Sequence, residues 1–63
     1  NKNVLHQDLS IYSKCLNNNG LLMLSGFFTS DNDIIVDSAK SVNLALLKTS
    51  SDENWSCLVF AKI

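Results

Sequence analysis

The apolar residues of the first segment recur at the spacing of a helix. They are separated by steps of four, three and four residues, which places them on one face of an amphipathic helix over residues 3–17. The Asn-rich stretch at residues 17–20 predicts the end of this helix, because Asn and Gly tolerate the left-handed conformation. The predicted stripe consists of Leu5, Leu9, Tyr12 and Leu16, widened by Val4, Ile11 and Cys15.

A continuous apolar run, Leu21–Ser25, lies between two glycines. Such a run, without alternation, predicts a strand that is covered on both faces, as in a parallel sheet with helices above and below it. A strand with one solvated face would instead alternate between apolar and polar residues. Gly26 then allows the backbone to turn sharply.

The next segment predicts a second helix that begins near Ser30. The Ser30 side chain can cap the helix, and Asp31 and Asp33 favour the positive end of the helix dipole. Asn43 is a residue that can end the helix in a left-handed conformation. The predicted apolar stripe of this helix consists of Ile35, Ala39 and Val42, with Ile34 beside it.

Two strands are predicted at the end of the chain, over residues 44–49 and 55–62, with a loop at residues 50–54. Strands joined by so short a loop must be antiparallel, because a parallel crossover needs a dozen or more residues. The last strand is expected to alternate, with Ser56, Leu58 and Phe60 on one face and Trp55, Cys57, Val59 and Ala61 on the other.

The resulting order, α-β-α-β-β, describes an incomplete sheet. A doubly covered strand at residues 21–25 needs a neighbour on each side, and the closing hairpin supplies one at most. The helix near Asn3 also lacks a preceding strand. We therefore expect residues 1–63 to be a single unit, the C-terminal half of a doubly wound, Rossmann-like α/β sheet. A chain that begins with Asn1 and has no signal-like leader fits a processed product or a fragment.

Composition narrows the function classes. The 63 residues carry five Lys, no Arg and six acidic residues, so a basic surface for nucleic acid is not expected. A hydrophobic content of 46% is too high for a disordered tail, and the apolar runs are shorter than a membrane span. A chain of this length buries only ~60% of its unfolded surface, so we expect it to be marginally stable alone.

Several short motifs follow one another in a recognisable order. They are Asn1–Leu5, Leu22–Phe27, Asp33–Ile34, Ala39, Leu44, Asn54–Trp55 and Lys62. Together they resemble the C-terminal end of class I S-adenosylmethionine-dependent methyltransferases, and more closely the PrmA-type ribosomal protein methyltransferases. In that family the last strand inserts between its neighbours in the sheet. The family's Gly-rich cofactor loop and acidic ribose ligand are not in this chain, and Asn43 stands where a Gly is common.

The resemblance implies a cytoplasmic enzyme that uses S-adenosylmethionine to methylate lysine and N-terminal amines of a large-subunit ribosomal protein. The implied partners are the rest of the methyltransferase domain and that ribosomal protein, with no direct contact to nucleic acid or membrane. The isolated 63 residues are expected to be inactive, to have no measurable affinity for S-adenosylmethionine, and to self-associate through their open strand edge.

In open α/β sheets the ligand lies at the carboxyl ends of the strands. Asn1 is therefore the candidate for binding the cofactor or the target amine, although helix capping is the alternative. Asn3, Ser25, Gly26 and Phe27 are the candidates for the edge of the substrate pocket. Their alternative roles are a strand end and turn for Ser25 and Gly26, and core packing for Phe27. The sequence identifies no catalytic residue.

No metal site is expected, because His6 is the single histidine and Asp31, Asp33 and Asp37 lack the pattern of a calcium-binding loop. Cys15 and Cys57 show neither C-x-x-C nor zinc-ligand spacing. Two buried, reduced thiols are expected, with a structural disulfide as the alternative.

Two other functions remain open at this point. One is a self-standing α/β module that binds a partner through an unpaired strand edge and has no catalytic activity. The other is a thiol-dependent redox peptide, which requires Cys15 and Cys57 to lie close together.

Overall fold

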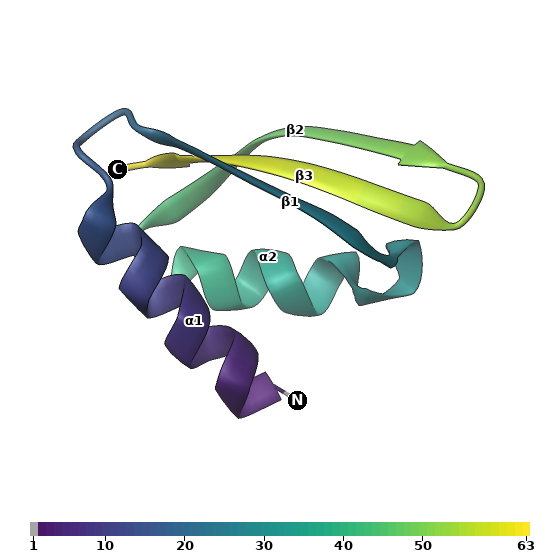
Figure 1. The fold of residues 1–63 in the computed structure, drawn as a ribbon, viewed down its shortest axis with the longest axis horizontal. Coiled ribbons are helices and arrows are strands. Elements are labelled where there is room, and N and C mark those ends of the chain that lie inside the picture. The colour runs from purple at the N-terminus through teal and green to yellow at the C-terminus, as the bar shows by residue number, and fades with distance from the viewer. Residues whose placement is uncertain (1) are drawn as a thin grey trace.

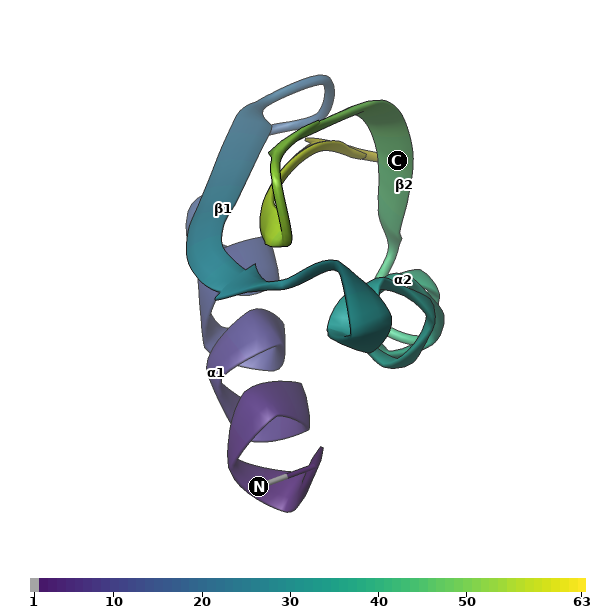
Figure 2. The same ribbon diagram turned by 90° about the vertical axis from the view of Figure 1, so that its right-hand side faces the viewer.

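The chain forms a three-stranded sheet with both helices on one side of it. The second helix runs along the sheet, and the first helix packs against the second, with its N-terminal half directed away from the sheet (Figures 1 and 2). A computed structural model describes residues 2–63, so the predicted cofactor ligand Asn1 lies outside the described residues. The order of elements agrees with the prediction, apart from one short additional 3-10 helix. The elements are α1 (Lys2–Cys15), β1 (Leu21–Phe28), η1 (Thr29–Asp31), α2 (Asn32–Lys40), β2 (Leu44–Asp52) and β3 (Trp55–Lys62).

The strands lie in the order β1-β3-β2, with the last strand of the chain in the middle. β3 is antiparallel to both of its neighbours, which confirms the predicted closing hairpin and the inserted last strand. β1 is an edge strand within residues 2–63, because it pairs with β3 alone. The expected parallel neighbour of β1 is therefore not among the described strands.

β1 corrects two predictions. The strand does not stop at Ser25 but continues to Phe28, and Gly26 forms a bulge rather than a terminating turn. Gly26 has a φ of +86°. In this conformation it is an extra residue of β1, between Ser25, which pairs with Cys57, and Phe27, which pairs with Ser56.

Only one face of β1 is covered in the described part of the chain. Leu22 and Leu24 are half-buried beneath the helices, whereas Leu21 and Met23 on the other face are 62% and 67% exposed. The continuous apolar run predicted cover on both faces, and cover on the second face is not observed. We call the face away from the helices the outer face.

The β2–β3 hairpin is tighter than predicted. Residues 50–52, predicted to lie in a loop, belong to β2, and the turn contains only Glu53 and Asn54. Polar residues extend the strand here because the residues at 50–52 pair with residues 55–57 of β3. Glu53 takes the left-handed conformation, with a φ of 57°.

The helix α1 buries a narrower stripe than its sequence indicates. Leu9 is buried, and Leu5 and Leu16 pack against the core. The remaining apolar positions of the predicted stripe are exposed, because buried Ser13 takes the inward position one turn after Leu9. These exposed positions are Val4, Ile11, Tyr12 and Cys15.

A short 3-10 helix that contains Ser30 precedes the second helix. The prediction that Ser30 caps the second helix is therefore wrong. Asp31 stands at the N-cap without a capping hydrogen bond from its side chain. Ile35 and Ala39 are buried as predicted, whereas Ile34 is exposed. Asn43 has a φ of 67° and so provides the predicted left-handed residue after the helix.

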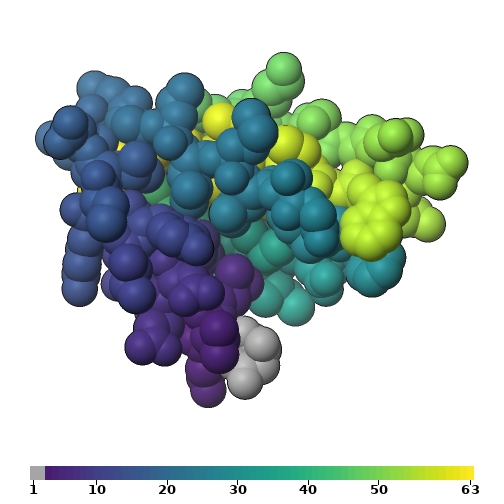
Figure 3. Space-filling model, viewed as in Figure 1, coloured from purple at the N-terminus to yellow at the C-terminus, as the bar shows by residue number. Residues whose placement is uncertain are grey.

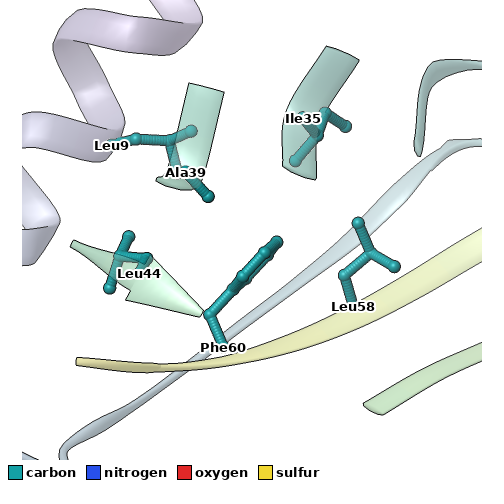
Figure 4. Packing of buried hydrophobic residues seen from close by; sticks show 6 residues of the cluster. All are labelled: Leu9, Ile35, Ala39, Leu44, Leu58 and Phe60. Atoms are coloured by element: carbon teal, nitrogen blue, oxygen red, sulfur yellow. The ribbon is translucent and has the colours of Figure 1, made fainter. Parts of the chain in front are cut away.

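The core lies between the helices and the sheet (Figure 4). The predicted alternation of β3 is confirmed, since Ser56, Leu58 and Phe60 are buried and Trp55 is exposed. The side chains of Leu58 and Phe60 project from the central strand towards α2, so the middle of the sheet carries two of the largest fully buried side chains. The core consists of Leu9, Ile35, Ala39, Leu44, Leu58 and Phe60.

The two cysteines are free thiols. Cys15 is exposed and Cys57 is half-buried, so the prediction that both are buried is wrong. Within residues 2–63, none of the helices has the length and apolar character needed to cross a membrane.

Candidate functional site

The carboxyl end of β1 holds three of the predicted pocket residues. Ser25 and Gly26 are exposed at the bulge, and a Cβ at Gly26 would meet no atom within 4 Å. Phe27 is half-buried and packs against the core, which agrees with its alternative role. The bulge thus leaves two small residues on the surface beside an anchored aromatic ring.

Asn3 lies elsewhere, in the first turn of α1. It is exposed and lines a surface depression of about 360 Å³ between the two helices, together with His6, Asp37 and Ser38. Neither Ser25, Gly26 nor Phe27 contributes to this depression. The described residues therefore do not bring the predicted pocket residues together in one cavity.

His6 bridges the two helices at that depression. Its Nδ1 atom lies 3.3 Å from the Oγ atoms of both Ser38 and Ser41. Ser41 Oγ donates to the carbonyl of Ser38 at 2.6 Å, so its proton is already used. This polar contact joins α1 to α2. Within residues 2–63, no group of three His, Cys, Asp or Glu side chains is placed so that it could hold a metal ion.

A second surface depression, of about 470 Å³, lies between α2 and β2. Asp33 and Lys40 border it on the helix, and Leu46 and Thr49 border it on the strand. It too excludes Asn3 and the bulge of β1.

The end of the sheet near the β2–β3 turn carries a feature that the sequence did not indicate. The rings of Phe28 and Trp55 stack with their centroids 4.8 Å apart and an angle of 20° between their planes. Both side chains remain about half exposed, at 52% and 53%. The N–H of Thr29 donates a hydrogen bond to the carbonyl of Asn54 at 2.9 Å. This bond connects the β2–β3 turn to the end of β1. Only the shifted register after Gly26 places these two rings opposite each other.

Comparisons with known proteins give one consistent family name. No family model matches the sequence. A protein of Porphyromonas gingivalis named ribosomal protein L11 methyltransferase is 43% identical over 60 residues, covering 95% of this chain and 21% of that protein. Proteins of the same name from Prochlorococcus marinus strain MIT 9215 and Phocaeicola vulgatus are 44% identical over 45 residues and 28% identical over 60 residues. These cover 71% and 95% of this chain, and 15% and 21% of the relatives.

The resemblance to the ribosomal protein methyltransferases is confirmed. The match fits a C-terminal segment of such a methyltransferase, and the chain spans about a fifth of the length of the curated relatives, 21% in the Porphyromonas gingivalis protein. The α/β fold, with a closing hairpin and an inserted last strand, is consistent with the C-terminal part of a Rossmann-like methyltransferase domain.

Proposed function

We propose that residues 1–63 form the C-terminal part of the catalytic domain of an S-adenosylmethionine-dependent protein methyltransferase. The whole protein would act in the cytoplasm on lysine and N-terminal amines of a large-subunit ribosomal protein. The observation that carries this proposal is the 43% identity over 95% of the chain to a protein named ribosomal protein L11 methyltransferase.

The structural task of the segment in this proposal is to complete a larger sheet. β1 pairs on one side only, and the exposed apolar side chains of Leu21, Met23 and Leu47 are left in solvent. An unpaired strand edge and exposed apolar residues are normally covered in a folded protein. We assign that cover to the preceding part of the methyltransferase domain.

In this proposal, residues 1–63 do not bind S-adenosylmethionine by themselves. The two surface depressions exclude the bulge of β1, and Asn3 lines only one of them. The proposal therefore gives most of the cofactor binding to the rest of the domain, with Asn1 as one contribution from this chain. Calorimetry on the isolated 63 residues should detect no binding of S-adenosylmethionine.

Asn3, Ser25, Gly26 and Phe27 are proposed to border the substrate pocket. When bound, the cofactor supplies a methyl group on a sulfonium for displacement by a neutral amine. The contribution of an enzyme to such a step is mainly alignment, which can lower the barrier by ~7–11 kcal/mol. The small residues Ser25 and Gly26 leave space for a substrate chain at the end of β1, and Phe27 anchors this edge in the core.

A chimera tests the proposal. The matching 60-residue stretch of the Porphyromonas gingivalis methyltransferase would be replaced by this chain, and transfer of a labelled methyl group to the ribosomal protein would be measured. We expect the chimera to be active and the same enzyme without the stretch to be inactive. A folded chimera without activity, beside an active parent enzyme, would refute the proposal.

The open edge of β1 also favours one alternative, a self-standing module that binds a partner by strand pairing. Both functions predict that the free chain self-associates, so sedimentation does not separate them. They differ in the chimera, because a self-standing module would not restore methyl transfer.

A further inference from the structure

A row of three side chains crosses the outer face of the sheet beside the β2–β3 turn. Trp55 on the central strand is paired with Phe28 on β1 and with Asp52 on β2. Residues directly opposite each other on neighbouring strands have Cβ atoms ≈ 4.5–5.5 Å apart and project from the same face. The carboxylate of Asp52 is therefore a neighbour of an indole ring that is stacked on Phe28.

This row is separate from the apolar surface that the rest of the domain is proposed to cover. The next row of the outer face contains Ser25, Cys57 and Ser50, of which both serines are exposed. Beyond that row lie the exposed Leu21 and Met23, towards the opposite end of β1. The aromatic pair thus stands at the end of the sheet beside the β2–β3 turn. Figures 1 and 3 show this turn at one end of the molecule.

The surroundings of the aromatic pair are acidic. Glu53 follows Asp52 in the turn, and Asp31 lies two residues after Thr29, whose N–H is bonded to the turn. None of the carboxylates at positions 31, 52 and 53 forms an ion pair or hydrogen bond within residues 2–63. Lys48 is the lysine of the outer face, and it pairs with Val59, two rows away from Trp55.

We propose that this end of the sheet binds a lysine or arginine side chain of a basic polypeptide. The cation would lie on the exposed aromatic surface of Trp55 and Phe28, because the face of an aromatic ring attracts a cation. Asp52 and Glu53 supply the opposite charge. The same negative charge disfavours a nucleic acid or an anionic membrane at this place.

Only the identity of the basic polypeptide rests on the proposed function. If the whole protein methylates a ribosomal protein, the basic polypeptide is that substrate, and the row would guide it towards the bulge of β1 next to Phe28. The binding of a cationic side chain follows from the surface itself and does not require methyl transfer.

Trp55 makes the test direct, because it is the one tryptophan of the chain and its fluorescence reports on this surface. The chain would be titrated with a short peptide that contains three lysines, and with the same peptide after acetylation of those lysines. We expect a saturable change in fluorescence with the first peptide and none with the second. The change should weaken as salt is added, since salt screens charges at the surface.

Matched variants locate the site. Replacing Asp52 and Glu53 by Asn and Gln should weaken binding roughly fivefold or more, in line with loss of two exposed charge contacts. Asp37→Asn, which removes an exposed carboxylate from α2, should leave binding unchanged. Phe28→Leu should weaken binding while keeping the reporter in place.

Four outcomes would overturn the inference. The first is that the acetylated peptide binds as tightly as the unmodified one. The second is that Asp37→Asn weakens binding as much as the replacement of Asp52 and Glu53. The third is that the fluorescence change fails to saturate with peptide concentration. Fourth, if the lysine peptide only reverses a fluorescence change that dilution of the chain alone also produces, a second copy and not the peptide occupies this surface, and the inference is overturned. An inactive chimera together with lysine-dependent fluorescence would refute the proposed function and leave this site standing.

Discussion

The ammonium group of Lys62 donates to both oxygen atoms of Ser13, at 2.6 Å to the carbonyl and 2.8 Å to Oγ, across 49 positions of sequence. Ser13 Oγ in turn donates to the carbonyl of Val42 at 2.5 Å. These bonds join the last residues of β3 to α1 and to the segment between α2 and β2. A partly buried polar network of this kind fixes the position of α1 on the sheet.

Ser13→Ala should lower the free energy of unfolding by about 1–3 kcal/mol, because the Lys62 ammonium and the Val42 carbonyl each lose a partner in a partly buried place. Urea unfolding followed by circular dichroism measures this change. Lys14→Met, which removes an exposed charge from the same helix, is the control and should have little effect. Equal stabilities of the two variants would show that the network does not hold α1.

Leu58→Ala should remove most of the stability of the chain. Leu58 is fully buried on the central strand, and such truncations cost about 2–5 kcal/mol. A domain of this size has only a few kcal/mol in total, roughly 0.05–0.15 kcal/mol per residue. Thermal unfolding should therefore lose its cooperative transition in this variant, whereas Leu47→Ala on the exposed side should retain it. A cooperative transition in both variants would contradict the core described above.

The bulge at Gly26 gives a prediction that depends on the backbone alone. Its φ of +86° disfavours a side chain, although a Cβ there would have open space around it. Gly26→Ala should lower the free energy of unfolding by about 1–2 kcal/mol. Gly26→Asn should cost less than Gly26→Ala, because Asn tolerates positive φ. Chemical denaturation measures the free energy of unfolding of both variants. A larger loss for Gly26→Asn than for Gly26→Ala would show that the backbone conformation is not the cause of the loss.

Glu53 should show opposite effects on stability and on binding. Its left-handed conformation in a two-residue turn suits Asn or Gly better than Glu. Glu53→Asn should therefore raise the free energy of unfolding by about 1 kcal/mol or less. The same substitution removes one of the carboxylates beside Trp55, so binding of the lysine peptide should weaken. Parallel denaturation and fluorescence titrations measure both quantities, and a stabilised variant with unchanged peptide binding would exclude Glu53 from the proposed surface.

The sequence predicted the elements that are defined by short-range patterns. The order of the elements, the hairpin and the alternation of β3 follow from spacing within one segment, and the structure confirms them. The prediction that the strand ends at Ser25 is wrong, because the bulge that lets it continue to Phe28 depends on the partner strand β3. The predicted apolar stripe of α1 is wider than the buried one, because the inward position of Ser13 depends on its hydrogen bonds with Val42 and Lys62.

The candidate site was less accessible to sequence reasoning. The contrast between exposed Ser25 and core-packed Phe27 depends on which face of the sheet each residue takes, and the bulge between them sets that. The stacked pair of Phe28 and Trp55 arises from residues 27 positions apart in sequence, through the shifted register. A periodic pattern within either strand contains no signal for it.

Hydrogen–deuterium exchange on the β1 amides that make no bond to β3 tests the central claim, that the open edge of this sheet is paired within a larger methyltransferase domain. It would compare the 63-residue chain with the whole protein, using the amides of central β3 as the internal reference. If the edge is paired in this way, these β1 amides exchange fast in the chain and are strongly protected in the whole protein. Equally fast exchange in both would contradict it.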